Sequence, residues 1–151
     1  MTFSMSHRLL HTKWLYQRIH KVHHTHINTV FYATACAHPI EILFGNIIPS
    51  AVGPLILGNK MHFTACLGWF IARNFESIDG HCGYEFSWSP FRWLPFATPY
   101  GYHAYHHSHN VGNYSSMFLT WDTILGSNVA YNKYMVEFKH AFASKHKTKQ
   151  A

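Results

Sequence analysis

The sequence predicts an all-α fold, in which an integral membrane helical hairpin carries a cytosolic cap of histidine-rich, metal-binding helices. Three features of the 151-residue chain lead to this prediction: an apolar stretch at about residues 40–78 with a turn in its middle, histidine clusters on both sides of that stretch, and basic ends. The length leaves room for about one domain. We therefore divide the chain into one domain at residues 1–132 and a basic C-terminal tail at residues 133–151.

The composition excludes several classes of protein. With 48% hydrophobic and 12% charged residues, the chain is not a disordered polyelectrolyte. Its three cysteines form no CxxC pair, which excludes a disulfide framework and a cysteine-rich zinc module. The formal charge of +6 lies at both ends while residues 41–132 are slightly acidic, which is the opposite of a nucleic-acid-binding pattern. The chain has 15 histidines and only six acidic residues, which indicates that the imidazole side chains have a functional role.

The predicted helices before the hairpin carry two histidine clusters. His7 and His11 are four residues apart, and the second cluster places His20, His23 and His24 three and four residues apart. Residues at these spacings share one face of an α-helix, so each cluster converges on one spot. At about 100° per residue, however, the two clusters would point nearly opposite ways on an unbroken helix. We therefore predict a break between the clusters, so that both serve one site.

The apolar stretch forms the two arms of the predicted hairpin. Residues 40–58 and 61–78 flank a Gly-Asn-Lys turn sequence at 58–60, and each arm approaches the roughly 20 residues that cross a bilayer. Pro49 and Pro54 interrupt the first arm. A buried αα-hairpin of a soluble protein is the alternative, but the basic flanks favour a membrane. A hairpin places both ends of the chain on the same side of the membrane. Because both ends are basic, the positive-inside rule predicts that this side is cytosolic.

A third cluster and a single histidine follow the hairpin. His103, His106 and His107 repeat the spacing of the second cluster, and His81 lies directly after the second arm. Neutral imidazole binds iron, zinc, copper or nickel. Nine histidines are too many for one tetrahedral zinc site. Soluble di-iron bundles use two Glu-x-x-His motifs, whereas this sequence has one, Glu137–His140, in the C-terminal tail and away from the clusters. Two iron ions held by imidazole fit this number best. The nine candidate ligands are His7, His11, His20, His23, His24, His81, His103, His106 and His107.

Acidic residues near the clusters are candidates for hydrogen bonds to the outer nitrogens of the ligands. We rank Asp79 and Asp122 above the other acids for this role. At the C-terminus, Lys147 and Lys149 stand five and three positions from the end, which is the pattern of a dilysine retrieval signal for the endoplasmic reticulum. A solvated lysine tail is the alternative.

The motifs HRLLH, HKVHH, AHPIE, HCGYEFSWSPFRWLPF and HAYHHSHNVGNYSSMFLTWDTILGSN resemble the fatty acid hydroxylase/sterol desaturase superfamily over residues 7–128. Within it, the chain is most similar to the sterol C-4 methyl oxidases, or methylsterol monooxygenases. The resemblance implies an endoplasmic-reticulum membrane enzyme, a non-haem di-iron monooxygenase. It would take electrons from NAD(P)H through a carrier such as cytochrome b5, and oxidise a C-4 methyl group of a sterol precursor with dioxygen. The nine histidines would be the ligands, with His38 a tenth ligand or a residue that supports them.

The chain departs from this family pattern at two places. Ala104 stands where relatives often have aspartate, and only six residues precede His7, where relatives carry another membrane hairpin. We therefore expect a fragment, an incomplete gene product or a degenerate copy, inactive or poorly folded by itself. Other readings are another sterol or fatty-acyl hydroxylase or desaturase, a non-catalytic metal-binding membrane protein, and an inactive truncated paralogue.

Overall fold

The computed structural model describes residues 1–99 and 101–148, with side chains as far as residue 145. Across these residues the structure is mostly helical, with an isolated β-bridge between Ala97 and Phe118 and no strand. The all-α prediction is therefore confirmed at this level. The α-helices are α1 (Thr2–Leu10), α2 (Lys13–Arg18), α3 (Pro39–Glu41), α4 (Ile48–Leu57), α5 (Phe63–His81), α6 (Tyr102–His109), α7 (Thr120–Ile124) and α8 (Val129–Thr148).

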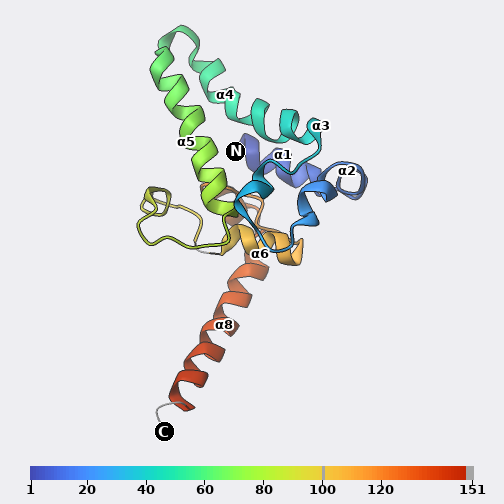
Figure 1. The fold of residues 1–151 in the computed structure, drawn as a ribbon, viewed down its shortest axis with the longest axis vertical. Helices are drawn as coiled ribbons and strands as arrows, with labels where there is room; N and C mark the ends of the chain where they lie inside the picture. Colours follow the sequence, from blue (N-terminus) through green and yellow to red (C-terminus); the bar gives the residue numbers. More distant parts are fainter. Residues whose placement is uncertain (100, 149–151) are drawn as a thin grey trace.

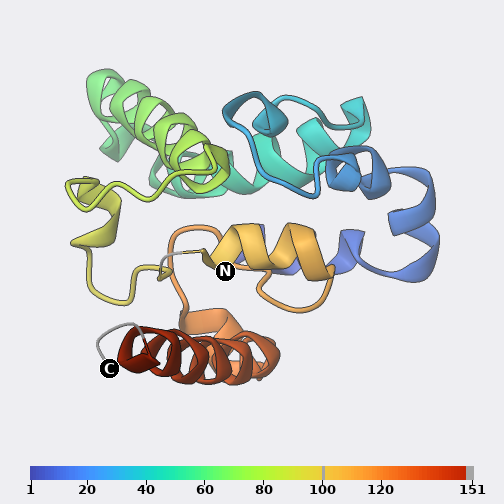
Figure 2. The ribbon, with the colours of Figure 1, turned by 60° about the horizontal axis from the view of Figure 1, so that its bottom comes forward.

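The helices lie in three tiers along the long axis of the molecule. Helices α4 and α5 form the first tier, α1 and α6 the second, and α8 the third, with the α4–α5 turn and the end of α8 at opposite extremes (Figures 1 and 2). Helix α1 contacts α4, while α5 contacts α6. Rings of α6 pack against α8 through Tyr102, Tyr105 and Tyr131, the small buried core of the chain. The middle tier therefore joins the apolar arms to the rest of the molecule.

The first apolar arm is one continuous helical segment, Pro39–Lys60, assembled from α3, the π-helix η3 (Ile42–Ile47), α4 and a 3₁₀ turn. Pro49 has no N–H to donate to the carbonyl of Gly45, and its ring crowds that carbonyl, which favours the wider π-turn just before it. Among the described residues this is the one helix long and apolar enough to cross a membrane, and only 17% of its most apolar window is buried.

The second arm, α5, differs from the sequence prediction. It runs three residues past residue 78 to His81, and its last turns carry Arg73 and Glu76, which form an ion pair. With Arg73, Glu76 and Asp79 along its length, it is less apolar than Pro39–Lys60 and is not a candidate membrane span by composition. The two arms are joined by the indole N–H of Trp69, which donates to the carbonyl of Ser50 at 2.8 Å.

The predicted break between the first two histidine clusters is present. Helix α1 ends at Leu10, α2 covers Lys13–Arg18, and a 3₁₀-helix, η1, covers His20–Thr25. At the other end of the chain, α8 begins at Val129, so the predicted boundary at residue 133 falls inside a helix. The side chain of Lys147 and all of Lys149, which carry the dilysine pattern, lie outside the described residues.

Candidate metal centre

The structure brings the nine predicted histidines together in two adjoining groups. Within each group, the ligand nitrogens all lie within 4.8 Å of one another. We call these the five-histidine group and the four-histidine group. The five-histidine group is His7, His11, His20, His24 and His106. The four-histidine group is His23, His81, His103 and His107. The groups touch where the rings of His24 and His107 stack, with centroids 4.6 Å apart.

Two of the clusters contribute to both groups. On α6, His106 joins the five-histidine group while His103 and His107 join the four-histidine group. In η1, His24 and His23 divide in the same way. The sequence spacing led us to expect each cluster to converge on one spot. The clusters are instead divided between the two groups. Because the groups lie side by side, neighbouring histidines of one cluster, such as His23 and His24, reach different groups.

In the five-histidine group, the hydrogen bonds fix the state of the rings. The Nδ1 atom of His7 lies 2.9 Å from the carbonyl of Tyr114, and that of His106 lies 2.6 Å from the carbonyl of Gly112. A carbonyl oxygen only accepts, so each Nδ1 carries the proton and each Nε2 of these neutral rings presents a lone pair. The Nδ1 of His20 likewise donates to Glu41 Oε1 at 2.7 Å.

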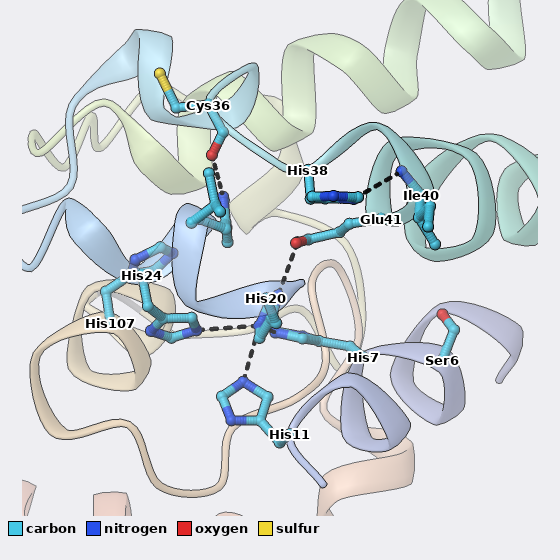
Figure 3. Close-up of polar contacts among 12 residues, drawn as sticks. Ser6, His7, His11, His20, His24, Cys36, His38, Ile40, Glu41 and His107 are labelled. Atoms are coloured by element: carbon cyan, nitrogen blue, oxygen red, sulfur yellow. Dashed lines mark hydrogen bonds and ion pairs between the residues drawn. The ribbon is translucent and has the colours of Figure 1, made fainter. Parts of the chain in front are cut away.

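These lone pairs converge on one another. His20 Nε2 lies 3.1 Å from that of His7, 2.9 Å from that of His11 and 3.1 Å from that of His24 (Figure 3). His7 and His20 both present an unprotonated Nε2, so these two nitrogens cannot share a hydrogen bond at 3.1 Å and repel each other. A cation between them removes the repulsion, so the arrangement fits a bound metal ion.

The four-histidine group has the same construction. The Nδ1 of His81 donates to the carbonyl of Ser77 at 2.8 Å, and the Nδ1 of His107 donates to the carbonyl of His26 at 3.2 Å. Their Nε2 atoms face inward, and His81 Nε2 lies 2.8 Å from that of His103. The buried outer nitrogen of His103 has no partner among the described residues. This group therefore also presents lone pairs to a cation.

Burial keeps these imidazoles neutral. Loss of water lowers the pKa of His7 and of His23 to about 4, and that of His24 to about 3. The same effect, increased by the neighbouring imidazoles, places the pKa of His106 well below its usual range. At neutral pH the rings therefore hold no proton that a metal ion must displace. A set of nitrogen donors of this kind suits iron, zinc or copper rather than magnesium or calcium.

Glu41 is the carboxylate that contacts a ligand, and the sequence prediction missed it. It is 4% exposed, comes from the last turn of α3, and points at His20 (Figure 3). Its second oxygen is buried without a partner in the described structure. The pattern that identifies it is its charge: it is the single charged residue in residues 40–58, and an ionisable residue in an apolar span usually has a function.

Two of the three residues that we expected to support the ligands, Asp79 and His38, lie elsewhere. Asp79 accepts from Ser89 and pairs with Arg92, and so holds the following loop to α5. His38 caps α3 by accepting from the N–H of Ile40, and its ring lies beside that residue in Figure 3. Neither is in the two histidine groups or hydrogen-bonded to them within the described chain. The prediction for these residues therefore differs from the structure.

Asp122 acts one step further from the ligands than predicted. It is 1% exposed and accepts from the hydroxyl of Tyr102 at 2.7 Å and from the N–H groups of Tyr114 and Ser115 at 3.2 and 2.7 Å. The carbonyl of Tyr114 is the acceptor for His7. Asp122 therefore fixes the loop that orients this histidine, and its own oxygens do not contact the ring.

Two cavities adjoin the histidines. One of about 30 Å³ touches members of both groups, together with Glu41 and Gly45, and has room for only one or two small molecules. The other, of about 510 Å³, opens beside His81 and His103 and is lined on its far side by α8. The second volume is in the range of sites for small organic ligands.

Gly112 supplies the carbonyl that orients His106, and we expect it to tolerate no side chain. Its φ is +61°, and a Cβ would collide with the carbonyl of Ser127. Gly126 has the same kind of backbone, with φ +65°, but open space around it. Gly126→Ala should cost about 1–2 kcal/mol for the left-handed conformation, and Gly112→Ala at least about 3 kcal/mol. Denaturant unfolding in detergent measures both, and equal losses would contradict the prediction.

Comparison with known proteins gives consistent matches. A sequence model described as fatty acid hydroxylase matches residues 1–127. Methylsterol monooxygenase 2-1 of Arabidopsis thaliana is 38% identical over 146 residues, covering 87% of this chain and 53% of the relative. A very-long-chain aldehyde decarbonylase of Oryza sativa is 40% identical over 134 residues, covering 87% of this chain and 49% of the relative. The chain thus spans about half the length of these relatives. No solved structure gives a significant match.

Proposed function

The chain belongs to the fatty acid hydroxylase family. From this membership we propose that it acts as an iron-dependent membrane monooxygenase that oxidises a lipid. The proposed substrate is a sterol precursor, oxidised at a C-4 methyl group, as the name of the methylsterol monooxygenase relatives suggests. The observation that carries the proposal is the pair of histidine groups, whose inward lone pairs suit two metal ions side by side. The ligands would be the nine histidines.

The side chains of this protein would position the reaction. Two iron ions, when bound, would activate dioxygen for hydroxylation of an unactivated C–H bond. The backbone carbonyls and Glu41 hold the imidazoles at fixed angles, so no reorganisation is needed when substrate arrives. The small cavity beside both groups has room for only one or two water-sized molecules, and the larger one beside His81 and His103 offers space for an apolar substrate.

We place Pro39–Lys60 across the endoplasmic reticulum membrane, with α5 returning so that both ends of the chain are cytosolic. The apolar, largely exposed surface of Pro39–Lys60 supports this placement, because such a surface is unfavourable in water. The histidine groups would then lie in a cap at the cytosolic face. Electrons would come from NAD(P)H through a cytochrome b5-like carrier, which the basic charge of the chain would attract.

A second candidate reaction starts from a long-chain aldehyde. It is favoured by the aldehyde decarbonylase relatives, which are as similar to this chain as the methylsterol monooxygenases are. The same histidine groups would serve it, but the substrate would be a flexible chain instead of a rigid ring system.

The two candidates can be separated by product analysis. If microsomes from cells that express the chain convert a 4,4-dimethylsterol into its 4-hydroxymethyl and 4-carboxyl products, in a reaction that requires NADPH and dioxygen, the sterol reaction is supported and the expectation that this chain is inactive by itself is overturned. A parallel incubation supplies a very-long-chain aldehyde. Consumption of the aldehyde without any sterol product would support the second reaction and contradict the first. Two bound metal ions with neither product would leave a metal-binding protein without this activity and contradict both candidates.

A further inference from the structure

We propose that residues 84–96 form a membrane-interface anchor, an aromatic loop that lies in the lipid headgroup layer beside α5 and sets the depth of the histidine groups. The inference rests on the membrane placement proposed above and goes beyond it, because the loop is outside both apolar arms. The loop would contact the lipid bilayer into which the two apolar arms insert.

The loop exposes large aromatic side chains in unusual density. Tyr84 is 73% exposed, Trp88 66%, Trp93 72% and Phe96 75%. Single exposed apolar residues are common on protein surfaces, but a contiguous run of this size marks a surface that meets another phase or molecule. We therefore expect another phase or molecule to cover the aromatic surface of the loop.

The exposure is imposed by the fold. Ser89 is 2% exposed and donates to Asp79 in the last turns of α5, and Arg92 pairs with the same carboxylate. Arg92 also donates to the carbonyl of Thr98, which is buried. Two polar residues of the loop, Ser89 and Arg92, are thus turned inward as fixed supports, while Glu85 and Ser87 are exposed beside the outward-facing aromatic residues.

The position of the loop matches the surface of a bilayer. Pro39–Lys60 has 22 residues and spans about 33 Å, close to the hydrocarbon thickness. Helix α5, with 19 residues, returns over nearly the same distance and ends at His81. The loop follows at that end, opposite the turn between the arms, and projects sideways from the lower end of α5 (Figure 1). Residues 84–96 would therefore lie where the acyl chains meet the headgroups.

The chemistry of the loop favours lipid over a protein or nucleic acid. Tryptophan and tyrosine are enriched at membrane interfaces because their rings are apolar while their N–H and O–H groups can remain hydrated. The loop carries two charged residues, Glu85 and Arg92, and Arg92 is held in the inward ion pair. It therefore presents no basic surface to an acidic partner, because its exposed charge is the acidic Glu85.

Quenching of tryptophan emission by brominated lipids tests the proposal. The chain has five tryptophans, at positions 14, 69, 88, 93 and 121. Three variants that keep only Trp93, only Trp69 or only Trp121, with phenylalanine at the other positions, are reconstituted into nanodiscs with bromine near the headgroups or deep in the acyl chains. Each must match the far-UV circular dichroism of the native chain. Trp69 lies in α5 and reports the arm, while Trp121 lies on α7 and serves as the control.

We expect Trp93 to lose most of its emission with shallow bromines, Trp69 to be quenched by deep bromines, and Trp121 to be quenched least. Quenching of Trp69 with no quenching of Trp93 would overturn the anchor and leave the membrane placement standing. A blue-shifted Trp93 that bromine does not reach would mean that protein, from a second copy or another segment, covers the loop. If neither residue is quenched, the membrane placement fails and the anchor fails with it.

Discussion

Replacing His20 with alanine should reduce the iron bound per chain from two ions to one. The Nε2 of His20 lies within 3.1 Å of the Nε2 atoms of His7, His11 and His24, so it is the common neighbour of three of the other four members of the five-histidine group. Its loss leaves the remaining imidazoles without their central member and Glu41 without the ring that it accepts from. The four-histidine group loses no ligand nitrogen and should keep its ion. Metal analysis of the iron-loaded, desalted chain gives the ratio.

Two further variants make this result specific. His103→Ala should remove the other ion and keep the one bound by the five-histidine group, because His103 belongs to the four-histidine group alone. His109→Ala, on the same helix but exposed and stacked on Tyr105, should leave both ions in place. If His20→Ala retains two ions, the five-histidine group is not a metal site. If it retains none, the groups do not bind independently, and that result would also refute the prediction.

The sequence predicted the participants of this site better than its arrangement. The i, i+3, i+4 spacing is a local property of the backbone, so it identified the clusters and showed that α1 and η1 could not form one straight helix. Which group each histidine joins depends on how α6 and η1 face each other across the site. His23 and His24 are neighbours in the sequence and are divided by that tertiary contact, which no local period encodes.

The residues that orient the ligands were harder to predict for a related reason. The acceptors for His7, His106 and His107 are backbone carbonyls of Tyr114, Gly112 and other residues, and any residue type supplies a carbonyl. Asp122 was chosen for its charge and acts through the loop that it holds. Glu41 is 21 residues from His20 of η1 and meets it only through the tertiary fold, in which α1 also packs against the first apolar arm.

That packing depends on Gly45. A Cβ at this position would lie 3.1 Å from Leu10 Cδ1 and 3.4 Å from Glu41 Cγ, so the glycine lets α1 approach the apolar arm closely. The π-turn that contains Gly45 begins directly after Glu41, and such turns often occur at functional sites. The conformation of the arm therefore determines where the carboxylate meets the five-histidine group.

Glu41→Leu should separate metal affinity from the stability of the metal-free chain. Removing the acceptor of His20 frees the ring to rotate and lowers its basicity, so iron affinity should fall by about 10–100-fold. The metal-free chain should become more stable, because leucine removes a buried carboxylate that has one oxygen without a partner among the described residues. His20 keeps a partner there, since without metal its ring can donate from Nε2 to a neighbouring imidazole. Competition with a chelator measures the affinity, and unfolding of the iron-free chain in detergent measures the stability.

The direction of the two effects decides what Glu41 does. Glu41→Gln keeps an acceptor for His20 without the charge, so its iron affinity should lie between those of the native chain and Glu41→Leu. Glu137→Gln, at an exposed position on α8, should change neither quantity. If Glu41 only helped the helices pack, Glu41→Leu would lower stability and affinity together. A rise in the stability of the metal-free chain together with a fall in iron affinity would mean that Glu41 is retained for the metal site, although it destabilises the fold.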